Sequence, residues 1–296
     1  MASNHLCNDG TTYQRVFEVY SRGFFEQQRN WIANILVPRF VDKLGLKSNS
    51  SNLRVLAVGS GVGSADIRLL DELFSGAKDF MSERKIQWIV VEPDGIAMKT
   101  FKDIISKRSE DFKNIEFVWI NKRFEEYIDG IQTADEQFDF IHFFNVLYYM
   151  DQDVVLKKAY ERLLQKQGML LCVVGSQGDI WKNMIEAFQF KIDLSHFQQP
   201  TNVDLCKIAE TYSWDYEMFD GKLDLEITQM FIENNPVGKA MLQFFLQTTN
   251  DPKELLGEEL YAELINFFKS QSWEVVNNGS NIFFVKCDEG ILLIYK

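Results

Sequence analysis

The chain has 296 residues and a formal net charge of −12 at pH 7. Such an excess of negative charge repels nucleic-acid phosphates and anionic lipid headgroups, so we expect neither a nucleic-acid partner nor a membrane partner. Hydrophobic residues make up 46% and aromatic residues 14% of the chain. This composition is enough for a large packed core and would also suit a pocket lined with aromatic rings.

The four cysteines and three histidines show no spacing typical of a metal site or of a disulfide framework, because no CxxC pair occurs and the histidines are isolated. The opening "MASNHLCNDG" lacks a basic patch followed by an apolar stretch. No run of about 18 apolar residues follows anywhere. We therefore expect a reduced, cytoplasmic, soluble protein without a bound metal.

The first predicted element is a helical region, "YQRVFEVYSRGFFEQQRNWIANILVPRFVDKL", which runs from Tyr13 to Leu44. Its apolar residues recur at helical spacing, with an interruption near Gly23. The polar run from Leu46 to Asn52 then separates this region from the rest of the chain.

Short apolar runs alternate with helical patterns after residue 52. Runs that are apolar on both faces, with helices between them, predict a doubly wound α/β fold with a parallel sheet covered on both sides. The runs span residues 53–58, 86–91, 115–119, 138–144 and 169–174, and the clearest helical patterns span residues 95–105 and 154–164.

The C-terminal part has a different pattern. Residues 223–228 alternate between apolar and polar, and two further apolar runs, 281–286 and 290–295, are separated by "CDE". Two strands joined by three residues are typical of an antiparallel hairpin. We therefore predict that such a hairpin closes one edge of the sheet.

The most informative short motif is Gly59-Ser60-Gly61-Val62-Gly63, at the end of the first predicted strand. Glycines allow a tight turn there and let a ligand approach the backbone beside a helix N-terminus. The spacing is GxGxG, not the GxGxxG of the dinucleotide fingerprint, and the absence of a following Lys-Ser/Thr excludes a P-loop. A cofactor loop and a purely structural turn are both compatible with this motif.

Glu92 follows the second predicted strand directly, in "IQWIVVEPD". An acid at this position can accept hydrogen bonds from both ribose hydroxyls of a cofactor. The alternative is an acid at a helix start, since Pro93 and Asp94 come next. NAD and S-adenosylmethionine both contain that ribose. The GxGxG form, the "VEPD" ending and the terminal hairpin resemble the seven-stranded S-adenosylmethionine-dependent methyltransferases more closely than the NAD-binding proteins.

Several segments resemble the histamine N-methyltransferases in order and spacing, from about Tyr13 to the end of the chain. They are "YQRVFEVYSRGFFEQQ", "VVEPDGIAM", "FDFIHFFNVLYYMDQD", "LLCVVGSQG" and "ILLIYK". The resemblance implies one class I domain over residues 1–296 with a seven-stranded Rossmann-like sheet. Its parts would be an N-terminal helical lid (1–48), a cofactor-binding core (53–200), and substrate-side insertions with the terminal hairpin (201–296).

The resemblance further implies an enzyme that transfers a methyl group from S-adenosylmethionine to an imidazole ring nitrogen of a small amine, with histamine as the first candidate and S-adenosylhomocysteine as the product. We also expect a monomer. The implied cofactor-binding residues are Tyr13, Phe17, Gly59, Ser60, Gly61, Glu92 and Phe144. Phe144 would lie beside the adenine, where the family has an aliphatic residue.

The implied substrate-binding residues include two with a catalytic role, Glu26 and Asn145, which would orient the imidazole; Asn145 replaces a glutamine of the family. An aromatic wall would surround the ring: Tyr148, Tyr149, Trp181 and Phe245. From the sequence alone, Glu26 would be a solvated helix residue, whereas Asn145 could equally be a turn residue and Tyr148 and Tyr149 could equally be part of the core.

Two departures from the family bear on the substrate. Cys287 or Asp288 replaces an asparagine that the family uses to bind the amine, and the tryptophan pattern after "GSQG" reads Asp179-Ile180-Trp181 here. Carnosine, histidine or another biogenic amine are therefore alternative substrates. A ligand-binding homologue without catalytic activity is the alternative of a different class.

Overall fold

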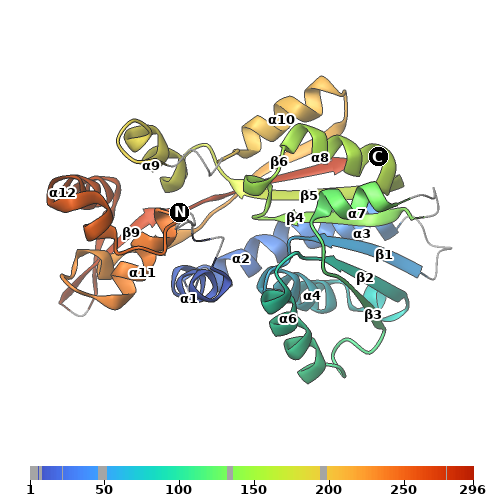
Figure 1. Ribbon diagram of the computed structural model, residues 1–296. Coiled ribbons are helices and arrows are strands. Elements are labelled where there is room, and N and C mark those ends of the chain that lie inside the picture. The colour runs from blue at the N-terminus through green and yellow to red at the C-terminus, as the bar shows by residue number, and fades with distance from the viewer. Residues whose placement is uncertain are drawn as a thin grey trace. The chain divides into compact units, whose positions relative to one another are not determined.

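The computed structural model describes residues 6, 9–21, 23–45, 52–131, 136–193, 199–277 and 279–296 (Figure 1). His5, Cys7, His196 and nearly all of the predicted polar run from Leu46 lie outside these residues. The chain divides into two compact units. We call residues 29–174, 200–220 and 290–296 the core unit, and residues 1–28, 175–199 and 221–289 the insert unit.

The core unit contains a seven-stranded sheet in the order β3-β2-β1-β4-β5-β10-β6. Strand β1 pairs in parallel with β2 and β4, β2 with β3, and β4 with β5. All five strands predicted between residues 53 and 174 are present. The strands are β1 (Asn52–Val58), β2 (Lys85–Val91), β3 (Ile115–Ile120), β4 (Phe138–Phe144), β5 (Leu164–Gly175), β6 (Asp215–Gly221) and β10 (Glu289–Tyr295).

Helices cover both faces of this sheet, because successive buried residues of β1 belong alternately to two different apolar clusters. Val55 and Ala57 belong to one apolar cluster with helices α3, α4 and α6, whereas Leu56 and Val58 belong to a second cluster with α7, α8 and α10. This is the doubly wound arrangement that the sequence predicts. The helices are α3 (Val37–Gly45), α4 (Ser64–Gly76), α5 (Lys78–Ser82), α6 (Gly95–Lys107), α7 (Phe124–Gly130), α8 (Gln152–Lys158) and α10 (Asn202–Thr211).

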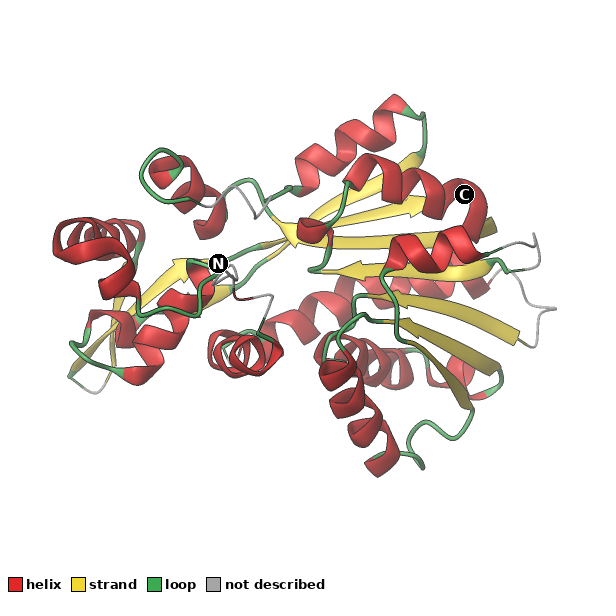
Figure 2. Cartoon of the chain, in the orientation of Figure 1, coloured by secondary structure: helices red, strands yellow, loops and turns green. Residues whose placement is uncertain are grey.

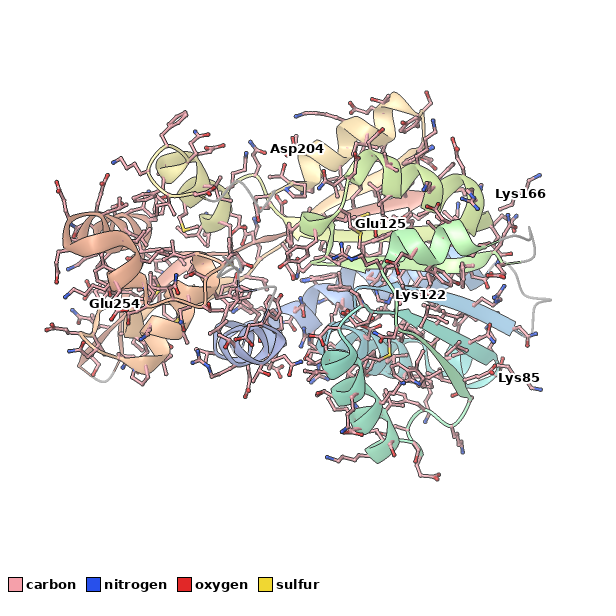
Figure 3. All side chains as sticks on the ribbon, viewed as in Figure 1. Lys85, Lys122, Glu125, Lys166, Asp204 and Glu254 are labelled. Atoms are coloured by element: carbon pink, nitrogen blue, oxygen red, sulfur yellow. The ribbon has the colours of Figure 1, made fainter. Side chains whose placement is uncertain are left out.

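Shorter helical turns complete the core unit. A π-helical turn links α2 (Phe25–Trp31), which begins in the insert unit, to α3, and another continues α8. They span Ile32–Leu36 and Ala159–Leu163, and a 3₁₀ turn spans Leu147–Tyr149. Lys85, at the start of β2, and Lys122, between β3 and α7, are exposed (Figure 3).

The insert unit combines helices with a separate three-stranded sheet of order β7-β9-β8 (Figure 2). Both pairings in this sheet are antiparallel. In the described part of the chain, no helix is long and apolar enough to cross a membrane. The elements are α1 (Gly10–Ser21), α9 (Ile180–Phe188), α11 (Pro236–Phe245), α12 (Pro252–Gln271), β7 (Asp224–Glu226), β8 (Trp273–Asn277), β9 (Ser280–Lys286) and a 3₁₀ turn, Thr228–Phe231.

The predicted pairing of residues 281–286 with 290–295 is wrong, although an antiparallel hairpin is present. Residues 281–286 belong to β9, which pairs with β8 and β7, whereas β10 lies between β5 and β6. The turn between Asn277 and Ser280 includes Gly279 at φ +78°, a conformation that suits a tight hairpin. Every residue of β10 is buried, which fits an interior strand of the large sheet.

Candidate functional site

The glycine loop after β1 holds three glycines with positive φ: Gly59 (+68°), Gly61 (+55°) and Gly63 (+80°). A Cβ atom on Gly59 would lie 2.2 Å from Val146, and one on Gly63 would lie 2.1 Å from Phe101. These two glycines therefore let the loop pack closely on the core unit. A Cβ on Gly61 would meet nothing within 4 Å, so the middle of the loop is open to a ligand.

Glu92 lies at the carboxyl end of β2 and faces this loop. Its Oε2 accepts a hydrogen bond from the Gly61 backbone N–H at 2.8 Å, and its Oε1 accepts one from the Asp94 N–H at 2.8 Å. Asp94, not Glu92, caps α6, because its side chain accepts from the N–H groups of Ile96 and Ala97. The helix-start explanation therefore applies to Asp94, and Glu92 is left as a fixed acceptor beside the loop.

The charge of Glu92 is held in an unfavourable environment. The residue is only 6% exposed, and this burial raises its pKa above the usual range of glutamate. The two backbone N–H groups oppose the rise, whereas the negative charges of Asp94 and Asp66 add to it. A buried carboxylate with remaining lone pairs benefits from further hydrogen-bond donors, which ribose hydroxyls could supply.

The loop itself has one unused polar group. The hydroxyl of Ser60 is buried and has no hydrogen-bond partner. Buried polar groups in proteins are nearly always paired, so this hydroxyl is suited to a bound polar ligand. Together, the open Gly61 backbone, the Ser60 hydroxyl and the Glu92 carboxylate fit a ribose-containing cofactor.

The end of β4 brings four of the predicted residues together. Phe144 is buried and stacks on Trp31, with ring centroids 5.7 Å apart. Asn145 has φ +50° and is exposed, and its Oδ1 accepts a hydrogen bond from the Tyr148 hydroxyl at 2.9 Å. Tyr149 is 44% exposed and lies edge-on to Tyr148. Asn145 therefore occupies a left-handed turn and also orients a neighbouring tyrosine.

The insert unit brings aromatic side chains together around α1. Tyr13 and Phe17 stack on each other, and both rings contact Phe244. Trp181 contacts Phe245 at 4.9 Å between centroids. Four of the predicted aromatic residues thus belong to one aromatic group of the insert unit.

A hydrogen-bonded chain inside this group includes two residues that are not among the predicted site residues, Tyr20 and Asp179. The Tyr20 hydroxyl accepts from the Trp181 Nε1–H at 2.8 Å and lies 2.8 Å from the Cys287 sulfur. Asp179 is 2% exposed, and burial raises its pKa to about 8. Cys287 is itself buried, and the Asp179 carboxylate accepts a hydrogen bond from the Trp181 backbone N–H at 3.3 Å, so one network connects α1, α9 and the segment after β9.

Of the remaining predicted residues, Asp288 is buried and Glu26 is exposed. The Asp288 carboxylate is buried, accepts a hydrogen bond from the Leu223 N–H and forms an ion pair with Lys222 at 2.7 Å. Glu26 is exposed in the first turn of α2. Its neighbour Gln28 is buried instead and donates a hydrogen bond to Glu289.

Comparisons with solved structures identify the class to which this fold belongs. Loganic acid methyltransferase with SAH superposes with a TM-score of 0.57 at 10% identity, covering 94% of each chain. The YcgJ protein from Bacillus subtilis gives 0.51 at 14% identity, covering 86% of this chain and 98% of that one. The chain therefore has the class I methyltransferase fold, as the sequence predicts.

Sequence comparisons point to a particular group within that class, although no protein-family model matches the chain. Histamine N-methyltransferase of Cavia porcellus is 24% identical over 95% of this chain and 90% of its own length, and that of Rattus norvegicus is 24% identical over 83% and 82%. Carnosine N-methyltransferase 2 of Gallus gallus is 24% identical over 70% of this chain and 63% of its own length. The resemblance expected from the sequence is confirmed.

Proposed function

We propose that the chain is an S-adenosylmethionine-dependent N-methyltransferase that methylates the imidazole ring of a small amine, with histamine as the first candidate. The observation that supports S-adenosylmethionine as the cofactor is the position of the Glu92 carboxylate, which two backbone N–H groups hold beside the open Gly61. The likeness to histamine N-methyltransferases over most of the chain supports the reaction. The whole chain would act as one methyltransferase domain, monomeric and cytoplasmic.

In this proposal the cofactor is bound by the glycine loop and its neighbours. Glu92 would accept hydrogen bonds from the ribose hydroxyls, and Gly59, Ser60 and Gly61 would line the loop. Phe144 would lie beside the adenine, and Tyr13 and Phe17 would belong to a lid. S-adenosylmethionine, when bound, supplies a methyl group that its sulfonium already activates.

The chain's own residues then have to orient the acceptor nitrogen and exclude water. A neutral imidazole is an adequate nucleophile, because its reference pKa of about 6.5 leaves most rings unprotonated at pH 7. Glu26 and Asn145 would orient the ring, and Glu26 could accept the proton from its other nitrogen. The aromatic side chains of Tyr148, Tyr149, Trp181 and Phe245 would enclose it.

A carboxylate-bearing imidazole is the second candidate. The similarity to the carnosine enzyme of Gallus gallus and the thiol of Cys287, where the family has an amide, favour it. Histidine and other biogenic amines belong to the same test. We would incubate the protein with methyl-labelled cofactor and each amine and identify products by mass spectrometry; labelled histamine or carnosine supports the proposal, and the absence of any labelled imidazole contradicts it.

Glu26→Gln tests the proposed substrate ligand. The amide keeps the shape of the side chain but loses its charge and its capacity to accept a proton, so we expect kcat/KM to fall by about tenfold or more. S-adenosylhomocysteine affinity and the melting temperature should stay unchanged, since Glu26 is exposed. Unchanged turnover of the best substrate would remove Glu26 from the site.

Cys287→Asn tests whether position 287 determines the preference between histamine and carnosine. Gaining one polar partner is worth about 1–3 kcal/mol, so we expect the ratio of kcat/KM for histamine to that for carnosine to rise by roughly ten- to a hundredfold. Cys287→Ser is the matched control, because it retains a small side chain that can hydrogen-bond to Tyr20. A ratio that does not change in the asparagine variant would show that this position does not select the substrate.

A further inference from the structure

The core unit contains a buried acid that the proposed function does not use. Asp66 is 0% exposed in the first turn of α4, three residues after Gly63. Its Oδ1 accepts a hydrogen bond from the Trp88 Nε1–H at 3.0 Å. The same oxygen lies 3.3 Å from Nε2 of His142, which is also buried, without hydrogen-bond geometry.

These contacts place Asp66 under the glycine loop. Trp88 lies on β2, four residues before Glu92, and His142 lies on β4, two residues before Phe144. Asp66 thus links α4 to the two strands whose carboxyl ends carry predicted cofactor residues. The position of the Asp66 side chain is therefore fixed by buried residues of the sheet.

Packing alone does not explain a carboxylate at this position. The second oxygen of Asp66 is buried without a hydrogen-bond partner, and so are both ring nitrogens of His142. Burying an incompletely paired charge is destabilising, and an asparagine could accept the Trp88 hydrogen bond without that penalty. The positive N-terminus of α4 offsets part of this cost, but packing does not account for the unpaired oxygen.

The charge of Asp66 acts on the cofactor loop. A helix N-terminus such as that of α4 is positive and favours anions such as phosphate, and an acid in the first turn opposes this field. Asp66 lies in the first turn of the helix that follows the loop, and its charge adds to the rise in the pKa of Glu92 that burial mainly causes. Within the described residues, neither Asp66, Glu92 nor Asp94 forms an ion pair with a lysine or arginine.

We propose that Asp66, hydrogen-bonded to Trp88 and packed beside His142, makes the glycine loop select a positively charged cofactor. This inference rests on the proposed function and adds a specificity-determining residue to it. S-adenosylmethionine carries one net positive charge, whereas S-adenosylhomocysteine, which lacks the sulfonium, is neutral overall. Asp66 acts through the electrostatic field and not through contact, so it favours the methyl donor over the product.

The test compares both ligands in one variant. Calorimetry should show that Asp66→Asn lowers the affinity for S-adenosylmethionine by about five- to tenfold and that for S-adenosylhomocysteine by less than about twofold. The variant should melt at or above the temperature of the parent protein, because the amide removes a buried charge. Asp66→Ser removes the charge without requiring the amide to fit and gives the same readout if the first variant is unstable.

Asp71→Asn is the matched control, since it removes the same charge from the same helix but from a partly exposed ion pair with Arg108. It should leave the ratio of the two affinities unchanged. An equal loss for both ligands in Asp66→Asn, or no loss for either, would overturn the inference and leave the proposed function intact. A parent protein that binds neither ligand would overturn the proposed function, and this inference with it.

Discussion

Replacing Glu92 with alanine should weaken binding of S-adenosylmethionine and S-adenosylhomocysteine by about 2–3 kcal/mol, or roughly 30- to 150-fold. The variant would lose the charged acceptor proposed for the ribose. It would also leave the N–H groups of Gly61 and Asp94 without the oxygens that they now contact. Calorimetry with both ligands measures the loss.

The ionisation of Glu92 gives this experiment a second readout. Because burial raises its pKa, the carboxylate takes up a proton at a higher pH than an ordinary glutamate, and cofactor affinity should fall as the pH is lowered through that range. Glu92→Gln should abolish this pH dependence, whereas Asp94→Asn, which retains the α6 cap, should preserve it. Affinity within twofold of the parent in Glu92→Ala would show that Glu92 only supports the loop.

The second large effect concerns stability. Asp179→Asn should stabilise the protein at pH 8.5 by up to about 5 kcal/mol relative to the parent, and much less at pH 4. The pKa of Asp179 is about 8 in the folded protein, against 3.8 for an unperturbed aspartate. Between these values the folded protein retains a proton that the unfolded chain releases, so the free energy of unfolding falls as the pH rises from about 4 to about 8.

An amide cannot ionise, so the free energy of unfolding of Asp179→Asn should not show this fall between pH 4 and pH 8. Urea unfolding at pH 4, 6 and 8.5, followed by tryptophan fluorescence, measures it in both proteins. Asp129→Asn is the control. It removes an exposed carboxylate whose own pKa is lowered by the hydrogen bond from Lys158, so this variant should show no gain in the free energy of unfolding at high pH. Parallel pH profiles of parent and Asp179→Asn would mean that Asp179 ionises normally.

The sheet could be predicted from the sequence because its strands are short apolar runs bounded by helical patterns. The true partners of β9 and β10 could not, since the three-residue connection between these two strands suggests a hairpin. The partners of β10, which are β5 and β6, are distant in sequence, and so is β7, one of the two partners of β9. The Cys287 N–H bonds to the Leu223 carbonyl, and the Asp288 carboxylate accepts from the Leu223 N–H. Such contacts appear only in the folded chain.

Some residues of the candidate site could likewise be predicted from the sequence, and others could not. The glycine loop and Glu92 each follow a predicted strand directly, so the order of elements was enough to pair them. Tyr20 and Asp179 gave no such signal, because their hydrogen-bonding partners come from other parts of the chain. Asp66 and His142 were equally inconspicuous: a lone acid on a helix and a lone histidine on a strand have no meaning until the fold brings them within 3.3 Å.

The position of β10 has a consequence for biosynthesis. The chain crosses between the two units five times, and its last crossing leads into the strand that fills the space between β5 and β6. A nascent chain that has already produced β1 to β6 therefore still exposes two unpaired strand edges while the ribosome makes the three-stranded sheet and α11 and α12. Unpaired edges are sites of aggregation, so the growing polypeptide should depend on chaperones until residue 295 has left the exit tunnel.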